Sequence, residues 1–274
     1  MVVGKRQSRP WIVSDELWSL IEPLLPVPAP KLVEGRPRVP DRQALCGILF
    51  VLHTGIQWEY LPQELGFGSG MTCWRRLAAW NEVGVWDQLH VLLLEKLRSK
   101  DQLDWSRAVI DSSHVRAARP GPKSGPSPVD RARPGSKHHL IVDGQGIPLA
   151  VSLTGGNRND VTQLLPLLDK IPPVAGRVGR PRRRPDALLA DRGYDHDKYR
   201  RLLWARGIRP VIAKRGEPHG TGLGIFRYVV ERTIAWLHGF RRLRIRWERR
   251  DDIHEAFLGL AVCLITHRHV QRLC

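Results

Sequence analysis

Apolar residues recur first with the period of helices and later with that of strands. In the first hundred residues, four segments carry apolar side chains three or four positions apart, and they begin near Asp15, Asp41, Ser69 and Val85. This spacing places the apolar side chains on one face of each helix, and Ser14 and Ser69 stand where they can cap two of them. A linker rich in Gly, Pro and Arg occupies residues 31–40. We therefore expect a small all-α unit over residues 1–103.

From about residue 104 the pattern changes to short apolar runs typical of strands. The runs at 108–110 and 188–190 are apolar throughout, as in strands buried on both faces, and an aspartate closes each. Residues 143–146, with the sequence Asp-Gly-Gln-Gly, separate two more runs and indicate a β-hairpin. Helical patterns follow at 160–168, 198–206, 226–237 and 253–270. Over residues 104–274 we predict a mixed sheet with helices packed on its faces.

Composition points to a polyanionic partner for this α/β protein. The 274-residue chain carries a formal net charge of +17. Its cations are mainly arginines in Gly/Pro-rich loops, notably at 117–137 and 176–185, which favours nucleic acid over a membrane surface. The longest apolar run, at 256–265, is far shorter than the roughly 20 residues that span a bilayer. The four cysteines form no C-x-x-C pair and are typical of reduced thiols in a cytosolic protein.

The all-α unit has the pattern of a DNA reader. It contains a helix, a stop and a second helix that carries Arg75 and Arg76, as in a helix-turn-helix motif. The alternative is a small helical bundle in which both arginines are only solvated. The net charge favours DNA contact.

Three carboxylates are candidates for the chemistry. Asp111 and Asp191 each end a predicted strand, where the following loop leaves a side chain free to act, and Glu231 lies on a predicted helix. If the fold brings them within about 5 Å, each ionised pair repels by about 3 kcal/mol, so the cluster must take up protons or bind a cation. Oxygen ligands suit Mg²⁺ or Mn²⁺, and two such ions can activate a water or a 3′-hydroxyl at a phosphodiester.

Other polar residues near these positions have alternative explanations. Ser112, Ser113 and His114 lack the glycines of a hydrolase nucleophile elbow. We interpret Asp143 as a turn residue, and the acids at 160 and 195 as helix caps. Arg227 lies one helical turn before Glu231 and can orient that carboxylate, meet a phosphate, or form a surface ion pair.

Several motifs together resemble the DDE transposases of bacterial insertion sequences, in the group named after insertion sequence five. They occur at 58–62 (WEYLP), 68–76 (GSGMTCWRR), 109–114 (VIDSSH), 135–139 (GSKHH), 190–195 (ADRGYD), 230–232 (VER) and 240–243 (FRRL). The resemblance covers nearly the whole chain.

This resemblance implies a ribonuclease-H-like catalytic domain at 104–274, with Asp111, Asp191 and Glu231 as catalytic residues and ligands of two Mg²⁺ or Mn²⁺ ions. Related transposases carry a tyrosine, arginine, glutamate and lysine signature around the glutamate. Arg227 and Glu231 match it, whereas Gly224 and His238 stand at the tyrosine and lysine positions. Arg241 or Arg242 can substitute for the missing groups.

The implied activity is transposition: binding of terminal inverted repeats by the helical unit, strand cleavage and strand transfer. Double-stranded DNA, from the transposon ends and the target, is the expected partner, with a homodimer acting on it in the bacterial cytoplasm at the nucleoid. The expected DNA-binding residues are Arg75, Arg76, Lys137, Arg182, Arg183, Arg184, Arg192, Arg227, Arg241 and Arg242. The alternatives are a non-catalytic DNA-binding regulator and a stand-alone nuclease of the same fold.

Overall fold

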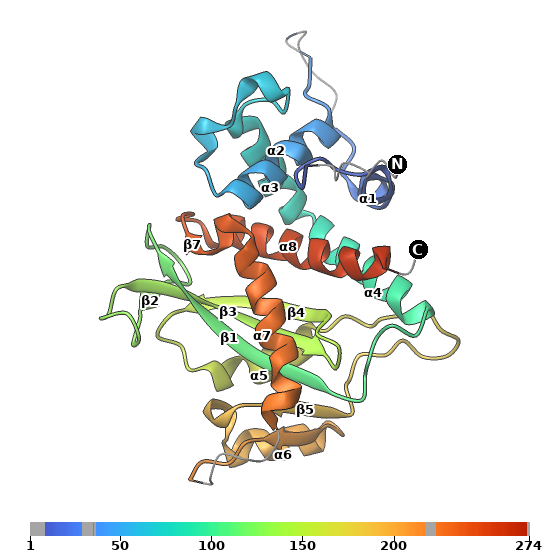
Figure 1. Cartoon of the computed structure of the whole chain (residues 1–274), viewed down its shortest axis with the longest axis vertical. Helices are drawn as coiled ribbons and strands as arrows, with labels where there is room; N and C mark the ends of the chain where they lie inside the picture. Colours follow the sequence, from blue (N-terminus) through green and yellow to red (C-terminus); the bar gives the residue numbers. More distant parts are fainter. Residues whose placement is uncertain (1–8, 29–34, 36, 217–222, 273–274) are drawn as a thin grey trace, which may run out of the picture.

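The computed structural model describes residues 9–28, 35, 37–216 and 223–272 (Figure 1). The predicted linker at 31–40 falls partly outside these ranges. In the described part, no helix is both long enough and apolar enough to cross a membrane.

Four helices form the amino-terminal unit, as the apolar spacing predicted. They are α1 (Asp15–Ile21), α2 (Asp41–Thr54), α3 (Gly70–Glu82) and α4 (Val85–Ser99), with short 3-10 turns η1 (Glu22–Leu24), η2 (Trp58–Tyr60) and η3 (Gln63–Leu65) between them. The Ser14 hydroxyl accepts a hydrogen bond from the amide of Leu17, and the Ser69 hydroxyl accepts one from that of Thr72, so both predicted caps are confirmed. Helix α2 ends at Gly55, whose φ of 77° a residue without a side chain adopts at little cost.

The rest of the chain builds one mixed sheet with helices on both faces, as predicted. Its strands are β1 (Ala108–Ala117), β2 (Gly125–Pro126), β3 (Pro134–Asp143), β4 (Pro148–Gly155), β5 (Ala187–Ala190), β6 (Arg209–Ile212) and β7 (Ile245–Arg246). The central order is β4-β3-β1-β5-β6. The pairs β3/β4 and β1/β3 are antiparallel, whereas β1/β5 and β5/β6 are parallel. Strand β2 adds to the start of β3, and β7 adds to the end of β1.

Side chains of the central strands alternate between two cores, as the strand period requires. On β1, Val109 packs with the helices α7 (Leu223–Gly239) and α8 (Asp251–Gln271). Its neighbours Ala108 and Ile110 face the other side, with α5 (Leu164–Lys170) and α6 (Asp197–Ala205). Figure 1 shows α7 crossing one face of the sheet and α8 lying between the sheet and the amino-terminal helices.

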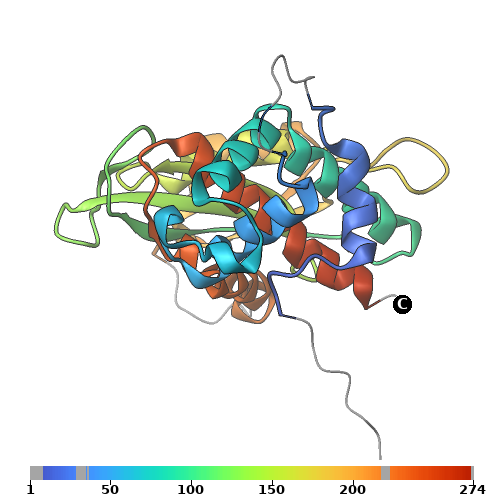
Figure 2. The same cartoon turned by 90° about the horizontal axis from the view of Figure 1, so that it is seen from above.

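The amino-terminal helices and the sheet share one of these cores. Buried residues of α2, α3 and α4 belong to the same cluster as α7, α8 and one face of β1 and β3. Figure 2, a view from above, shows the amino-terminal helices lying over α8 and the sheet. Whether residues 1–103 fold as a separate domain stays a prediction.

Four local predictions need correction or confirmation. The stretch at 117–137 is not simply a loop, because it contains β2 and the start of β3, which pair with Gly125 opposite Gly135. Asp143 is confirmed in its hairpin, since its carboxylate accepts from the amides at 145 and 147. Neither of the other two acids caps a helix: Asn159, not Asp160, caps η4 (Asp160–Gln163), and Asp195 instead binds Arg200.

Candidate active site

The strands bring the two aspartates close together near the end of β5. The prediction that Asp111 ends its strand is wrong, because β1 continues to Ala117 and Asp111 pairs with Leu140 on β3. Asp111 follows Ile110 on β1, just beyond the point where β1 pairs in parallel with β5, and Asp191 directly follows β5. The Asp191 carboxylate accepts a hydrogen bond of 2.8 Å from the amide of Gly193 and so starts the turn η5 (Arg192–Tyr194). Asp111 accepts one of 2.8 Å from the amide of Ser112.

Helix α7 completes the site with Glu231 and Arg227, which lie one turn apart. The Nη2 atom of Arg227 lies 3.4 Å from Asp111 Oδ2, 4.0 Å from Asp191 Oδ2 and 3.9 Å from Glu231 Oε1. Because all three oxygens lie within 4.0 Å of the same nitrogen atom, no two of them can be separated by more than twice that distance. The three carboxylates that the sequence singled out, from two strands and a helix, therefore gather around one guanidinium.

The environment of the three acids differs. Glu231 is exposed and Asp191 is partly exposed, whereas Asp111 is largely covered. Burial raises the pKa of Asp111 above its ordinary value, and the nearby Asp191 charge raises it further. The Ser112 amide and the Arg227 charge oppose this rise. Among the three acids, Asp111 is therefore the one whose ionised form a nearby cation stabilises most.

Tyr194, three residues after Asp191, is a buried polar residue near the site that the sequence reasoning did not single out. Its side chain is 1% exposed, and its hydroxyl has no hydrogen-bond partner in the described structure. Burial raises its pKa well above the ordinary value, and the charges of Asp160, Asp111 and Asp191 add to this effect. The hydroxyl is thus a buried donor without a partner, and Asp160 affects it electrostatically more than Asp111 or Asp191 does. Its place in the ADRGYD motif was the available signal.

As arranged in the structure, the carboxylates do not form a ready metal site. Among the residues described, no group of three or more His, Cys, Asp or Glu side chains is positioned to hold a metal ion. The chemistry of the donor set still fits a divalent cation, because all three side chains offer oxygen ligands and repel one another when ionised. The position that a cation would need is close to the Arg227 guanidinium.

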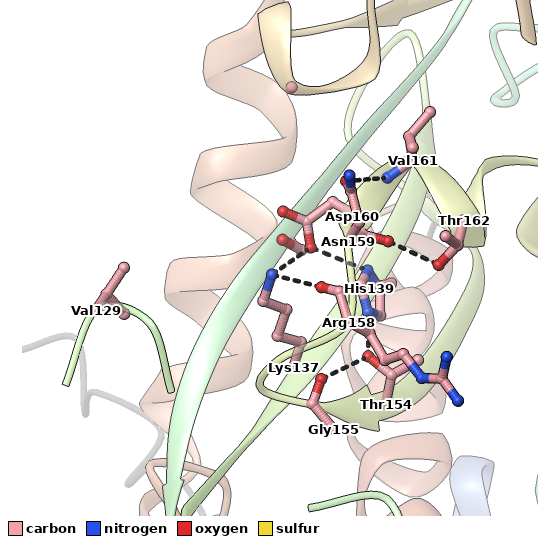
Figure 3. Close-up of polar contacts among 12 residues, drawn as sticks. Val129, Lys137, His139, Thr154, Gly155, Arg158, Asn159, Asp160, Val161 and Thr162 are labelled. Atoms are coloured by element: carbon pink, nitrogen blue, oxygen red, sulfur yellow. Dashed lines mark hydrogen bonds and ion pairs between the residues drawn. The ribbon is translucent and has the colours of Figure 1, made fainter. Parts of the chain in front are cut away.

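A second polar cluster lies on the face of the sheet opposite Asp111 (Figure 3). Lys137 Nζ lies 2.9 Å from Asp160 Oδ1 and donates a hydrogen bond of 2.9 Å to the carbonyl of Arg158. The same Asp160 oxygen is 3.8 Å from His139 Nδ1, and His139 Nε2 is 2.7 Å from the Thr154 hydroxyl. These contacts hold the turn before η4 against β3 and β4, and η4 lies against η5.

Some of the predicted DNA-binding residues are available at the surface. Arg75, Arg183, Arg184 and Arg241 are exposed, and Arg192 is half-buried. Arg182 pairs with Asp186 at 2.6 Å and remains partly exposed. These six stay candidates for phosphate contact, whereas Arg227 belongs to the carboxylate cluster.

The structure does not support direct DNA contact by three other residues in their present positions. Arg242 is 4% exposed, because it forms a buried ion pair with Glu248. The side chains of Arg76 and Lys137 are each 14% exposed, since Arg76 pairs with Asp41 and Lys137 with Asp160. Sequence spacing alone does not distinguish a basic side chain that faces solvent from one that forms an ion pair with an acid of the same protein.

Comparison with known proteins gives three matching family models. Residues 13–90 match a model described as "Putative transposase of IS4/5 family", and residues 105–223 and 188–267 match two models described as "Transposase DDE domain". A Burkholderia cepacia protein described as "Putative transposase for insertion sequence element IS402" is 61% identical over 166 residues, which cover 61% of this chain and 77% of that protein.

Two further similarities complete the comparison. A 16.2 kDa protein of insertion element IS402 from the same organism is 58% identical over 119 residues, covering 43% of this chain and 81% of that protein. Among solved structures, the Mos1 strand transfer complex aligns with a TM-score of 0.36 and 12% identity over 89% of this chain and 79% of that chain. From the family models and the first relative, we conclude that this chain belongs to the DDE transposases of bacterial insertion sequences.

Proposed function

We propose that this transposase binds the terminal inverted repeats of its own element, cuts DNA at the ends and joins the 3′ ends to target DNA. The observation that carries the proposal is that Asp111, Asp191 and Glu231 gather around the guanidinium group of Arg227. A protein that only binds DNA gains nothing from three carboxylates that repel one another.

In this proposal the three carboxylates hold two divalent cations, Mg²⁺ or Mn²⁺. Such ions, when bound, lower the pKa of a water or a 3′-hydroxyl and stabilise the departing oxygen at the phosphorus. The chain positions the acids: β1 and β5 fix the two aspartates, and α7 supplies Glu231. In cleavage, a water oxygen bonds to phosphorus as the 3′ oxygen leaves. In joining, that 3′-hydroxyl replaces the water and displaces a target 3′ oxygen.

The basic surface holds DNA in this proposal. Exposed arginines on α3, in the loop at 176–185 and at the start of η6 (Arg241–Leu243) contact phosphates, and residues 1–103 supply recognition of the repeats. Because each neutralised phosphate releases counterions, binding must weaken steeply as salt rises. Two ends have to be joined together, so a homodimer on DNA is part of the proposal.

Strand transfer tests the proposal. The substrate is a duplex carrying the inverted repeat that flanks the reading frame, with supercoiled plasmid as target and Mg²⁺ or EDTA in parallel reactions. We expect Asp191→Asn to lower joining by about a thousandfold or more, because a lost ligand costs several kcal/mol of transition-state stabilisation. Asp169→Asn is the matched control, since Asp169 is an exposed acid paired with Arg206.

The outcomes separate the alternatives. Undiminished joining by Asp191→Asn rules out the assigned site. DNA binding without any cutting in Mg²⁺ indicates a regulator, and cutting without joining indicates a nuclease.

A further inference from the structure

Arg227 stands in the middle of the carboxylate cluster without a short hydrogen bond to any of its members. Its Nη2 atom is 3.4 to 4.0 Å from one oxygen of each acid. Charge-assisted hydrogen bonds between nitrogen and a carboxylate are typically about 2.7 to 2.9 Å long. One guanidinium therefore serves three acids at once and is held by charge more than by directed hydrogen bonds.

The rest of the Arg227 side chain is also weakly anchored. Its Nε atom is buried and has no hydrogen-bond partner within the described structure. A guanidinium with five donors is normally satisfied in a fixed fork when its role is structural. An arginine held by a single shared contact can be displaced by a cation of higher charge.

We propose that Arg227 is an internal counter-cation, which occupies the carboxylate cluster in the DNA-free protein and has to leave before a divalent cation binds. This proposal rests on the proposed function of the same site. The guanidinium competes with the cation for Asp111, Asp191 and Glu231, and a DNA phosphate is the anion to which it moves. Arg227 therefore lowers the affinity of the free protein for divalent cations, so cations bind tightly only once DNA is present.

Mn²⁺ binding to the full chain without DNA tests this competition. Electron paramagnetic resonance of free Mn²⁺ gives the Kd of the parent and of each variant, after circular dichroism has established that the variant is folded. We expect Arg227→Gln to bind Mn²⁺ about tenfold more tightly or better, because a positive charge close to all three ligands is removed. In the double variant with Asp191→Asn this gain should disappear.

Two matched variants separate competition from a general effect of charge. Arg232→Gln removes the same charge from the same helix, but Arg232 lies over Tyr228 and Trp236 and donates to the carbonyl of Gln145. We expect its Kd to stay within about threefold of the parent value. Arg227→Lys keeps the charge and should also stay near the parent. Equal or weaker Mn²⁺ binding by Arg227→Gln, or an equal gain in Arg232→Gln, overturns the proposal.

A measurement on the parent chain does not depend on how the variants fold. Phenylglyoxal modifies accessible guanidinium groups, and mass spectrometry reports the labelling of each arginine. Mn²⁺ should increase the labelling of Arg227 and leave that of Arg232 unchanged; no increase at Arg227 contradicts the displacement. If strand transfer succeeds while these results fail, only the counter-cation role is lost. If the parent chain neither joins DNA nor binds Mn²⁺, the proposed function itself fails.

Discussion

Replacing Arg242 by methionine should destabilise the fold strongly. Arg242 donates to Glu248 Oε1 from Nε at 2.8 Å, and its Nη2 lies 2.6 Å from the same oxygen. Its Nη1 donates to the carbonyls of Gly55 and Ile56, at the end of α2. The Arg242→Met variant leaves Glu248, which is 7% exposed, as a buried charge without its arginine. Removing one partner of a buried ion pair typically costs about 3 to 5 kcal/mol.

A double-mutant cycle measures this effect by urea unfolding, followed through tryptophan fluorescence. We expect Arg242→Met and Glu248→Gln each to lower the free energy of unfolding, and the double variant to lose less than their sum by about 2 kcal/mol or more. Arg241→Met is the control. The Arg241 side chain, next to Arg242 in the sequence, is exposed, so its replacement should lower the free energy of unfolding by less than about 0.5 kcal/mol. If Arg242→Met costs no more than Arg241→Met, the buried pair does not stabilise the fold as argued.

Three further results are expected. The pKa of His90 is lowered to about 4 by burial, so its stabilising effect is complete above its ordinary pKa of 6.5 and is lost as pH falls from there toward 4. The parent should therefore lose about 2 kcal/mol more unfolding free energy than His90→Gln between pH 7 and pH 5, as measured by urea titration; equal losses would contradict this. A Cβ at Gly70 would lie 1.8 Å from the carbonyl oxygen of Trp58, whereas one at Gly239 meets nothing within 4 Å. Gly70→Ala should lower the free energy of unfolding by about 1 to 3 kcal/mol and Gly239→Ala should not, and similar melting temperatures for the two would refute the packing argument. Arg75→Ala should reduce the slope of log affinity for duplex DNA against log salt by about 1, and an unchanged slope would remove Arg75 from the DNA surface.

The candidate site was predicted from sequence to the extent that local patterns mark the ends of strands. Asp111 and Asp191 each follow an apolar run, and Asp191 ends its strand as the pattern predicted. Strand β1 instead continues past Asp111, because its polar residues at 112–114 pair with β3. Glu231 was placed on a helix by the apolar spacing, but its approach to the aspartates came from the family resemblance. The assignment of Arg242 to DNA failed because burial depends on Glu248 and on the end of α2, and no local pattern reports either contact.

Sequence alone determined most elements of this protein, because most helix caps, the apolar periods and the aspartate that ends β5 are local properties. It also determined the excess of positive charge and the three acids that are candidates for catalysis. Only the tertiary structure decided which cations face solvent and which neutralise an acid, since that depends on residues far apart in the chain. The same reason explains why Arg227 was found among all three carboxylates only when α7 and β5 were seen together against β1.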